Sequence, residues 1–357
     1  MNKKPNVTVV GAGLSGLMLA YRLHQQGIAV SVLEAASRTG GRIQTVTGKH
    51  DTPMELGATW LSKQHPKLSK LLTELNLSKF EQFVEGVTLF HSKSFEPPQQ
   101  FYTPPLDDPS YRIAGGTSML ITELEKKLPA GTISLECMVT SVEDCGNIIE
   151  LSDGDGKAYQ ADIVALCAPP RLMAGSISFN PPFSPNIESV ISTVHTWMSG
   201  AIKFVIEYER PFWREQKFSG SLYSQTGLIS EMYDHMDATG THFGFTGFLN
   251  SNAAYYSQKD REKLVIGQLA TYFGYEAQLP AFYADKAWKD KFISGEEHVF
   301  EFAHQNNGHA FLQQAYMNGK LYFSGSETAD SHPGYMEGAV VAAERTACKI
   351  INQLKNI

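Results

Sequence analysis

Three glycines near the N-terminus have the spacing of a phosphate-binding turn. Gly11, Gly13 and Gly16 follow the apolar run 6–10 in the order G-x-G-x-x-G. The first glycine permits a tight turn, the second lets a pyrophosphate approach the backbone, and the third lets a helix pack closely on a strand. Glu34 follows at a distance where its carboxylate can accept hydrogen bonds from a ribose hydroxyl pair. The pattern predicts a dinucleotide site, the alternative being a glycine-rich turn that binds nothing.

The sequence on either side of these residues predicts the strands and the helix that would position them. Residues 6–10 are β-branched and apolar, which is typical of a fully buried parallel strand. Residues 14–26 carry apolar side chains at helical spacing, and Gly27 follows as a helix stop. A second apolar run, 28–33, ends directly before Glu34. This order predicts a Rossmann-like unit whose helix N-terminus meets the phosphates of the ligand.

A second glycine turn follows the second strand. Gly40 and Gly41 precede Arg42 at a point where a nicotinamide site needs no such turn. A flavin dinucleotide that is buried along its whole length does need one, because a further cation and more backbone N–H groups must meet its phosphates. The alternative for Arg42 is an ordinary ion pair on the surface.

Length and composition narrow the class of protein. The chain has 357 residues, which is enough for two domains with sizeable cores. Its residues are 42% hydrophobic and 19% charged, as in an ordinary soluble globular protein. The net charge is −7 and no basic cluster compensates for it, so we expect no nucleic-acid partner.

Cysteine spacing and apolar runs suggest an intracellular protein without a metal. The four cysteines, Cys137, Cys145, Cys167 and Cys348, have neither metal-binding nor redox spacing, so we expect reduced, buried thiols. The N-terminal apolar run is too short for a signal peptide, and no stretch is long enough to span a membrane. We therefore expect no membrane partner and a cytoplasmic location.

Several separated segments resemble the flavin-containing amine oxidases, the family of monoamine and polyamine oxidases. The glycine-arginine turn at residues 40–42 resembles the second signature of that family. Residues 201–213 are similar to its V-I-K…P-F-W pattern, and residues 321–347 come close to its C-terminal signature. Residues 51–62 resemble its acidic-Leu-Gly-Gly-Ser-Tyr segment, with Ala58 and Trp60 in place of the second glycine and the tyrosine.

The resemblance implies an α/β fold with two domains. The first would be a Rossmann-like FAD-binding domain, built from a parallel sheet plus a β-meander. The second would be a mixed α+β substrate domain. We expect the FAD-binding domain to comprise residues 1–78, 110–182 and 291–357. The substrate domain would comprise residues 79–109 and 183–290.

The resemblance also assigns roles to individual residues. Lys203 would hold a water near flavin N5, Tyr335 and His298 would form facing walls around the amine, and Trp288 belongs to the family's Trp-plus-Ser-Gly-Gly segment. From residue type alone, Lys203 reads as a solvated strand residue, and Tyr335 as a cap residue that packs on its own helix. The positions expected to bind the cofactor are Gly11, Ala12, Gly13, Leu14, Ser15, Gly16, Glu34, Ala35, Gly41, Arg42, Gly57, Ala58, Thr59, Val139, Glu327 and Met336.

The activity implied is FAD-dependent amine oxidation. A primary or secondary amine would be deaminated by hydride transfer to flavin N5, and dioxygen would reoxidise the flavin with formation of hydrogen peroxide. Two alternatives remain open on the same scaffold. One is a flavin-dependent C–C desaturase, which would need neither Lys203 nor the Tyr335 wall, and the other is a flavin-binding protein without amine chemistry.

Four departures from the family pattern qualify these expectations. Ala36 stands where the family often has an arginine near the ribose. Glu297 stands where covalent members have the flavin-linking cysteine, so we expect a non-covalent cofactor. His298 replaces a tyrosine of the aromatic cage. Residues 79–110 are far shorter than the helical insert that roofs the active site, so we expect an open pocket.

Overall fold

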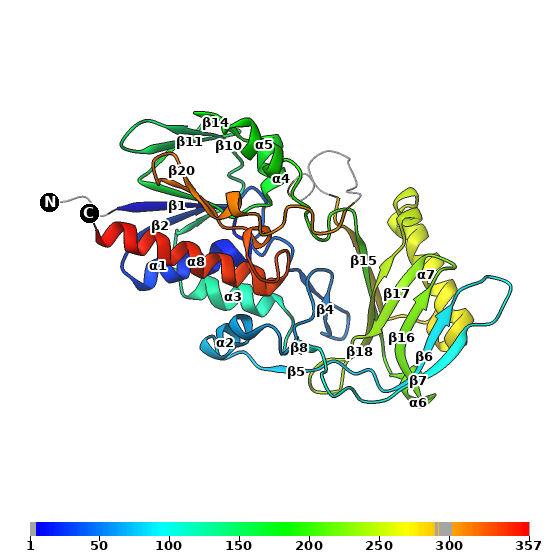
Figure 1. Ribbon diagram of the computed structural model, residues 1–357. Coiled ribbons are helices and arrows are strands. Elements are labelled where there is room, and N and C mark those ends of the chain that lie inside the picture. The colour runs from blue at the N-terminus through cyan, green and yellow to red at the C-terminus, as the bar shows by residue number, and fades with distance from the viewer. Residues whose placement is uncertain (1–4, 290–291, 293–301, 357) are drawn as a thin grey trace.

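The computed structural model describes residues 5–289, 292 and 302–356. Two large sheets lie at opposite ends of the molecule, and shorter segments run between them (Figure 1). The expected fold class is confirmed, because a mainly parallel sheet with helices and a meander is combined with a second, mixed sheet. His298 and Glu297 lie outside the described residues.

The first sheet contains the glycine turn at the carboxyl end of its central strand. Its six strands follow the order β20-β21-β13-β1-β2-β9. Each neighbouring pair in it is parallel except β20 with β21. Because both faces of the sheet are covered, β1 can be apolar along nearly its whole length. The strands are β1 (Asn6–Val10), β2 (Ala29–Leu33), β9 (Ile133–Ser134), β13 (Ile163–Leu166), β20 (Ala315–Tyr316) and β21 (Leu321–Phe323).

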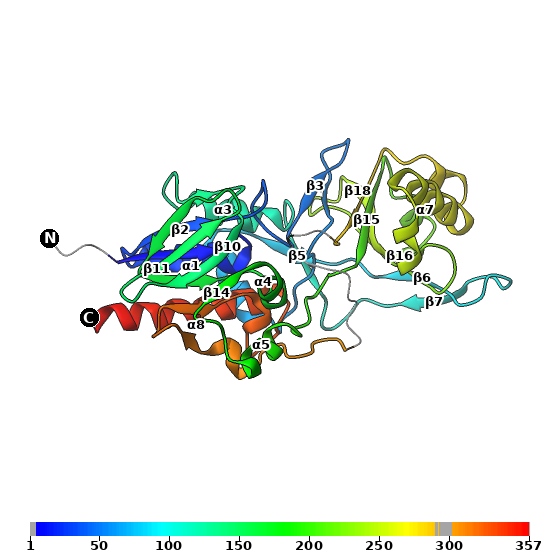
Figure 2. The same cartoon turned by 90° about the horizontal axis from the view of Figure 1, so that it is seen from above.

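Helices cover one face of this sheet and a meander covers the other (Figures 1 and 2). On the helical side, α1 (Leu14–Gln25), α2 (Pro66–Glu74), α3 (Ser118–Lys126) and α8 (Met336–Lys355) contribute to one hydrophobic cluster. The other side is covered by a four-stranded sheet in the order β12-β11-β10-β14. Its elements are β10 (Val139–Asp144), β11 (Ile149–Asp153), β12 (Ala158–Ala161), β14 (Ser178–Asn180), and the adjacent helices α4 (Pro170–Ser176) and α5 (Pro185–Ile191).

The second large sheet has seven strands in the order β19-β15-β18-β17-β16-β6-β7. Its outer face packs against α7 (Gln258–Phe273), as Figure 2 shows. Its inner face meets the first region, where Val205 packs against Met54 and Leu56. The elements are β6 (Gly86–His91), β7 (Gln99–Thr103), β15 (Ile202–Tyr208), α6 (Phe212–Glu215), β16 (Phe218–Ser224), β17 (Ile229–Asp234), β18 (Phe243–Leu249) and β19 (Phe282–Ala287).

Short elements connect the two regions. Two small antiparallel sheets pair β3 with β4 and β5 with β8. Their bounds, with those of the 3-10 turns, are β3 (Thr45–Thr47), β4 (Pro53–Glu55), β5 (Lys79–Glu81), β8 (Tyr111–Ile113), η1 (Ser251–Tyr255), η2 (Tyr275–Gln278), η3 (Ala310–Gln313) and η4 (Ser326–Thr328).

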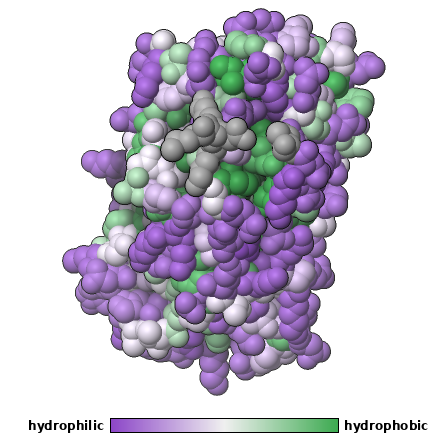
Figure 3. All heavy atoms as spheres, turned by 90° about the vertical axis from the view of Figure 1, so that its left-hand side faces the viewer, coloured by the Kyte–Doolittle hydropathy of each residue, from purple (hydrophilic) through white to green (hydrophobic). Residues whose placement is uncertain are grey.

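Local signals in the sequence agree well with these elements. The helix expected over 14–26 is α1, and Gly27 after it has the positive φ of 71° that a helix stop requires. The proline-rich stretch within 81–110 contains no helix and forms the β6–β7 hairpin and its flanks. Within the described residues, no helix combines the length and apolar character that crossing a membrane requires. The face on which both chain ends lie is mostly hydrophilic (Figure 3).

The expectation of four buried thiols is wrong for two of them. Cys145 is exposed because it lies in the turn between β10 and β11, where few atoms can cover it. Cys348 is exposed although it lies on α8, because it is outside the stripe of that helix that packs on the core. Cys137 and Cys167 are partly buried, and all four cysteines are free thiols.

Candidate active site

The first glycine turn has the shape of an anion cradle. A Cβ atom on Gly16 would lie 1.9 Å from the carbonyl oxygen of Gly11, so α1 can approach β1 this closely only with glycine at that position. A Cβ atom on Gly13, by contrast, would meet nothing within 4 Å. Gly13 is the N-cap of α1, and the first backbone N–H groups of a helix favour an anion. An anionic group such as a diphosphate could therefore approach the backbone at Gly13 without meeting another atom of the protein.

The second glycine turn is held directly against the first. The N–H of Gly40 donates to the carbonyl of Ala12 over 2.8 Å, and Gly13 and Gly40 form a parallel bridge. A Cβ atom on Gly41 would lie 3.4 Å from the Cα of Gly13. Residues that are about 30 positions apart in the chain thus form one glycine-lined surface, as parallel strands joined by a helix allow.

Arg42 extends from this surface toward the C-terminal signature. Its Nη1 donates to Oε1 of Glu327 over 2.5 Å, and its Nη2 donates to the hydroxyl of Ser326 over 2.9 Å. The Glu327 side chain is fully buried, so this is not the ordinary surface ion pair that residue type alone allows. The contact joins the second glycine turn to η4, just before α8.

Glu34 lies beside the glycine turn with both carboxylate oxygens directed at backbone. Oε2 accepts a hydrogen bond from the N–H of Ala12 over 2.6 Å, and Oε1 accepts one from the N–H of Ala36 over 2.8 Å. Ala35 lies between these groups, and Val139 is buried at the start of β10. Each carboxylate oxygen keeps a second lone pair that a hydroxyl group could use.

The remaining expected cofactor positions surround the same surface. Leu14 and Ser15 begin α1, and the Ser15 hydroxyl donates to the carbonyl of Ser324. Met336 begins α8 and is buried. The N–H of Ala58 donates to the carbonyl of Arg42 over 3.0 Å, which places residues 57–59 beside the second glycine turn.

Lys203 reaches this segment from the second large sheet. Its Nζ donates to the carbonyl of Gly57 over 2.8 Å and also to the hydroxyl of Thr59. The side chain is 1% exposed, so the reading of Lys203 as a solvated strand residue is wrong. Burial lowers the pKa of Lys203 to about 7, although the carboxylate of Glu55 opposes this shift. The ammonium is therefore close to losing its proton at neutral pH.

Aromatic rings enclose the Lys203 ammonium. Its Nζ lies 5.0 Å from the ring centre of Trp60 and 5.5 Å from that of Phe248. The Trp60 indole N–H donates to Oε1 of Gln82 over 2.9 Å, and its ring contacts that of Tyr233 edge-on at 5.0 Å. The sequence pattern predicts no role for Phe248, Gln82 or Tyr233. They lie on other strands or loops, and no spacing in the chain marks them.

Trp288 and Tyr335 occupy different surroundings. Trp288 is fully buried, and its indole N–H donates to the carbonyl of Leu56 over 2.7 Å. Tyr335 is the N-cap of α8 and is 40% exposed. Its ring stacks on Trp197 at 5.8 Å and on His304 at 6.2 Å, so it does not pack merely on its own helix. His298, expected as the facing wall, lies outside the described residues.

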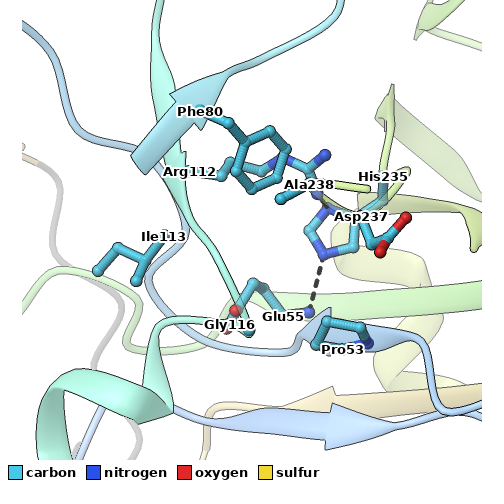
Figure 4. Close-up of a pocket in the computed structure, with 10 residues that line it drawn as sticks. Pro53, Glu55, Phe80, Arg112, Ile113, Gly116, His235, Asp237 and Ala238 are labelled. Carbon is cyan, nitrogen blue, oxygen red and sulfur yellow. Dashed lines mark hydrogen bonds between the residues drawn. The ribbon is translucent and has the colours of Figure 1, made fainter. Parts of the chain in front are cut away.

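A buried polar cluster supports the segment next to Lys203. Figure 4 shows Glu55, His235 and Arg112 gathered around a small cavity of about 10 Å³, which is room for one water molecule. The N–H of Glu55 donates to Nε2 of His235 over 3.1 Å, and Oε1 of Glu55 accepts from the N–H of Thr117 over 2.6 Å. These bonds tie β4, which leads into residues 57–59, to α3 and to the end of β17.

Burial sets the charges in this cluster. It raises the pKa of Glu55, and it lowers the pKa of Arg112 to about 10. Burial, with the nearby cations Arg112 and Lys203, holds the pKa of His235 well below its ordinary value, so that this ring is neutral at pH 7. The acid and the two cations are thus fixed together where the two regions meet.

Comparison with known proteins identifies the family. The model of the family of flavin-containing amine oxidoreductases matches residues 14–98 and 89–351. The chain belongs to that family. It is accordingly an FAD-dependent oxidoreductase that acts on amines, which makes the desaturase and the flavin-binding protein without amine chemistry the less favoured alternatives.

Individual relatives agree with this assignment. The chain is 23% identical to a probable flavin-containing monoamine oxidase A of Dictyostelium discoideum, with 98% of each chain covered. It is 24% identical to the flavin-containing amine oxidase B of Homo sapiens, with all of this chain and 88% of that protein covered. That second alignment extends over 463 residues, so the human enzyme has segments that this shorter chain lacks.

Solved structures share the fold. Wild-type putrescine oxidase bound to putrescine has a TM-score of 0.82 at 21% identity, with 98% of this chain and 99% of that chain covered. Cyclohexylamine oxidase from Brevibacterium oxydans has a TM-score of 0.83 at 19% identity, with 99% and 100% covered. The arrangement of the two large sheets is therefore shared with amine oxidases of known structure.

Proposed function

We propose that the protein binds FAD non-covalently and oxidatively deaminates a primary or secondary amine, with dioxygen as the electron acceptor and hydrogen peroxide as a product. The observation that carries this proposal is the burial of Lys203, whose ammonium donates to the Gly57 carbonyl beside the glycine surface. Among the described residues, the direct hydrogen-bond partners of the Lys203 ammonium are a carbonyl and a hydroxyl group and include no carboxylate. Burying a lysine in this way is costly and calls for a function. Its position beside the proposed flavin site supports a role in flavin chemistry.

The residues of the glycine surface fit FAD by shape and charge. The space at Gly13 and the N-terminus of α1 would take the diphosphate, and Glu34 would accept hydrogen bonds from the ribose hydroxyls. Arg42 would provide the further cation, and the backbone of Val139 would contact the adenine end. The N-terminus of α8 at Met336 would stabilise negative charge at the pyrimidine end of the flavin. Bound FAD supplies the site with its acceptor for two electrons.

The protein's own groups would then orient the amine and a water molecule. The exposed ring of Tyr335 provides an aromatic wall that attracts a cationic amine as it enters. Lys203 would hold a water molecule near flavin N5. Since the amine must be neutral to react, we expect the rate of flavin reduction to rise toward alkaline pH.

Other expectations from the sequence belong to the same proposal. We propose that residues 1–78, 110–182 and 291–357 bind FAD and that residues 79–109 and 183–290 shape the substrate site. Neither nucleic acid nor a membrane is expected as a partner. The cytoplasmic location stays a prediction.

An anaerobic amine screen tests the proposed function. The purified yellow protein is mixed without oxygen with a panel of aliphatic, aromatic and diamine substrates, and the flavin absorbance is followed. Bleaching by at least one amine, with an aldehyde or ketone as product, is the expected result. A flavin that no amine bleaches, but that dithionite reduces normally, would contradict the proposal. Bleaching by a hydrocarbon or porphyrinogen substrate instead would support the desaturase.

A further inference from the structure

A carboxylate lies in line with Lys203 across the second large sheet. Lys203 on β15 pairs with Phe248 on β18, and Phe248 pairs with Glu231 on β17. Glu231 pairs in turn with Tyr223 on β16. Residues that face one another in neighbouring strands share a face of the sheet, so Glu231 is on the same face as Lys203. Two strand spacings separate them, or roughly 10 Å between their Cα atoms.

Aromatic side chains form a continuous surface from Lys203 to Glu231. Trp60 contacts the Lys203 ammonium at one end and the Tyr233 ring at the other. The Tyr233 hydroxyl donates to Oε2 of Glu231 over 2.9 Å, and the Tyr223 ring meets the Tyr233 ring edge-on at 6.0 Å. Glu231 and Tyr233 are half-buried, whereas Tyr223 is 41% exposed. This part of the sheet face is therefore reachable from solvent.

A half-buried carboxylate beside tyrosine rings is suited to a cation. An ammonium group there would gain a charge-assisted hydrogen bond and the attraction of the ring faces. An alkyl end at the same place would instead cover the carboxylate without a compensating charge, which is unfavourable. The site thus favours a ligand that carries a positive charge at Glu231 over one that ends there in a methyl group.

We propose that Glu231, with Tyr223 and Tyr233, binds the second ammonium group of a diamine whose first amino group is oxidised beside Lys203. This inference rests on the proposed function, because it places the reacting end of the substrate next to Lys203. The substrate class is then an alkane diamine or a longer polyamine. The spacing of Glu231 from Lys203 sets a preferred chain length.

Replacement of Glu231 by glutamine tests the role of its charge. Glu231→Gln keeps the size of the side chain and an oxygen that can accept the Tyr233 hydrogen bond. Each diamine of a homologous series is compared with the n-alkylamine that has one more carbon, so that a methyl group replaces the second ammonium. We expect the parent protein to favour the best diamine by at least about tenfold in kcat/KM, or about 1.4 kcal/mol. Glu231→Gln should lower this ratio at least tenfold.

A remote glutamate serves as the matched control. Glu150 lies on β11 of the four-stranded sheet, where its described side-chain contact is a long hydrogen bond of 3.4 Å from Gln160. Glu150→Gln should keep the diamine-to-monoamine ratio of the parent protein. If Glu231→Gln keeps the diamine-to-monoamine ratio of kcat/KM, because neither value changes or because both fall equally, the assignment of Glu231 is overturned.

Calorimetric titration of the FAD-loaded protein with the diamine, without oxygen, separates this inference from the proposed function. Weaker diamine binding in Glu231→Gln, with no bleaching of the flavin in either protein, would support the cation subsite and contradict amine oxidation. If amines bleach the flavin but both proteins bind the diamine with equal affinity, amine oxidation is supported and the cation subsite at Glu231 is contradicted.

Discussion

At the scale of single residues, Lys203 shows how a sheet can change the properties of a side chain. Its strand is covered on both faces, so the ammonium loses bulk water and donates to a carbonyl and a hydroxyl group instead. This burial lowers its pKa to about 7. A charge that develops beside it during electron transfer to dioxygen would be stabilised without reorganisation of solvent.

Replacement of Lys203 by methionine should slow reoxidation of the flavin while leaving the cofactor bound. Methionine has a similar volume and lacks the charge, so we expect the rate with oxygen to fall at least about tenfold, or about 1.4 kcal/mol of barrier. In stopped-flow experiments the flavin is reduced anaerobically and mixed with oxygenated buffer. Lys263→Met, on the exposed side of α7, is the control and should reoxidise at the parent rate.

The pH dependence of the same reaction gives a second readout. With a pKa near 7, Lys203 is charged below neutral pH and neutral above it. Reoxidation of the parent protein should therefore slow as pH rises through 7, and the methionine variant should lose this step. Equal rates in both proteins, with the same pH profile, would remove Lys203 from the reaction with oxygen.

Glu34 presents a related case, in which a carboxylate serves both the protein and the proposed ligand. Glu34→Ala removes the carboxylate that would accept hydrogen bonds from the ribose hydroxyls. It also removes the acceptor to which the N–H groups of Ala12 and Ala36 donate. We expect FAD affinity to fall by about 1.5–3 kcal/mol, as for other charged hydrogen-bonding groups. Titration of the apoprotein with FAD measures this loss. An affinity equal to that of the parent would argue against the ribose assignment.

At the scale of elements, the β1–α1 turn separates two uses of glycine. Gly16 is required by contact within the protein, because its Cβ position is occupied by the carbonyl of Gly11. Gly13 faces open space and is required only if a ligand fills that space. Within the same motif, glycine is therefore needed at position 16 for folding and at position 13 for binding of the ligand.

Two alanine substitutions should distinguish these uses. Gly16→Ala overpacks the contact between α1 and β1, which should cost about 1–3 kcal/mol of folding free energy. Gly13→Ala should change the stability of the apoprotein by less than about 1 kcal/mol. It should nevertheless weaken FAD binding at least about tenfold. Denaturant unfolding of the apoproteins and FAD titration give the two quantities. Tight FAD binding by Gly13→Ala would show that no phosphate group lies there.

At the scale of the whole molecule, the proposed FAD site gathers segments from both ends of the chain. Residues near 11, 34, 42, 57, 139, 327 and 336 lie on different elements of one sheet and its neighbours. A ligand that contacts all of them binds the folded state only. Free FAD at about 100 times its dissociation constant should then stabilise the fold by about 2.7 kcal/mol.

The attachment of the cofactor is also tested on the whole molecule. Because Glu297 stands where covalent members have a cysteine, we expect FAD to be released when the holoprotein is precipitated with acid. The flavin should appear in the supernatant and migrate as intact FAD in chromatography. Flavin that stays with the precipitated chain would contradict non-covalent binding. A protein with covalently attached flavin, precipitated in the same way, is the control, and its flavin should stay with the precipitate.

The parts of the fold that depend on local geometry could be predicted from the sequence. The G-x-G-x-x-G spacing, the flanking strand and helix, and Gly27 as a helix stop are all encoded within about 30 residues. They appear in the structure as β1, α1 and β2. Arg42 was expected from the second glycine turn and Tyr335 from a family resemblance, and their contacts with Glu327 and with Trp197 became known only from the fold.

The way in which residues from distant strands meet could not be predicted from the sequence and follows from the pairing of the strands. Lys203, Phe248 and Glu231 come into one row because β15, β18 and β17 pair in a particular register. A shift of one residue in that pairing would turn Glu231 to the other face of the sheet. Register is set by packing of the whole sheet against α7 and β4, and no local pattern in the chain records it. The same holds for the burial of Lys203. Along β15, Lys203, Val205 and Glu207 alternate with apolar residues, a pattern typical of a face that meets water, and packing against β4 covers that face instead.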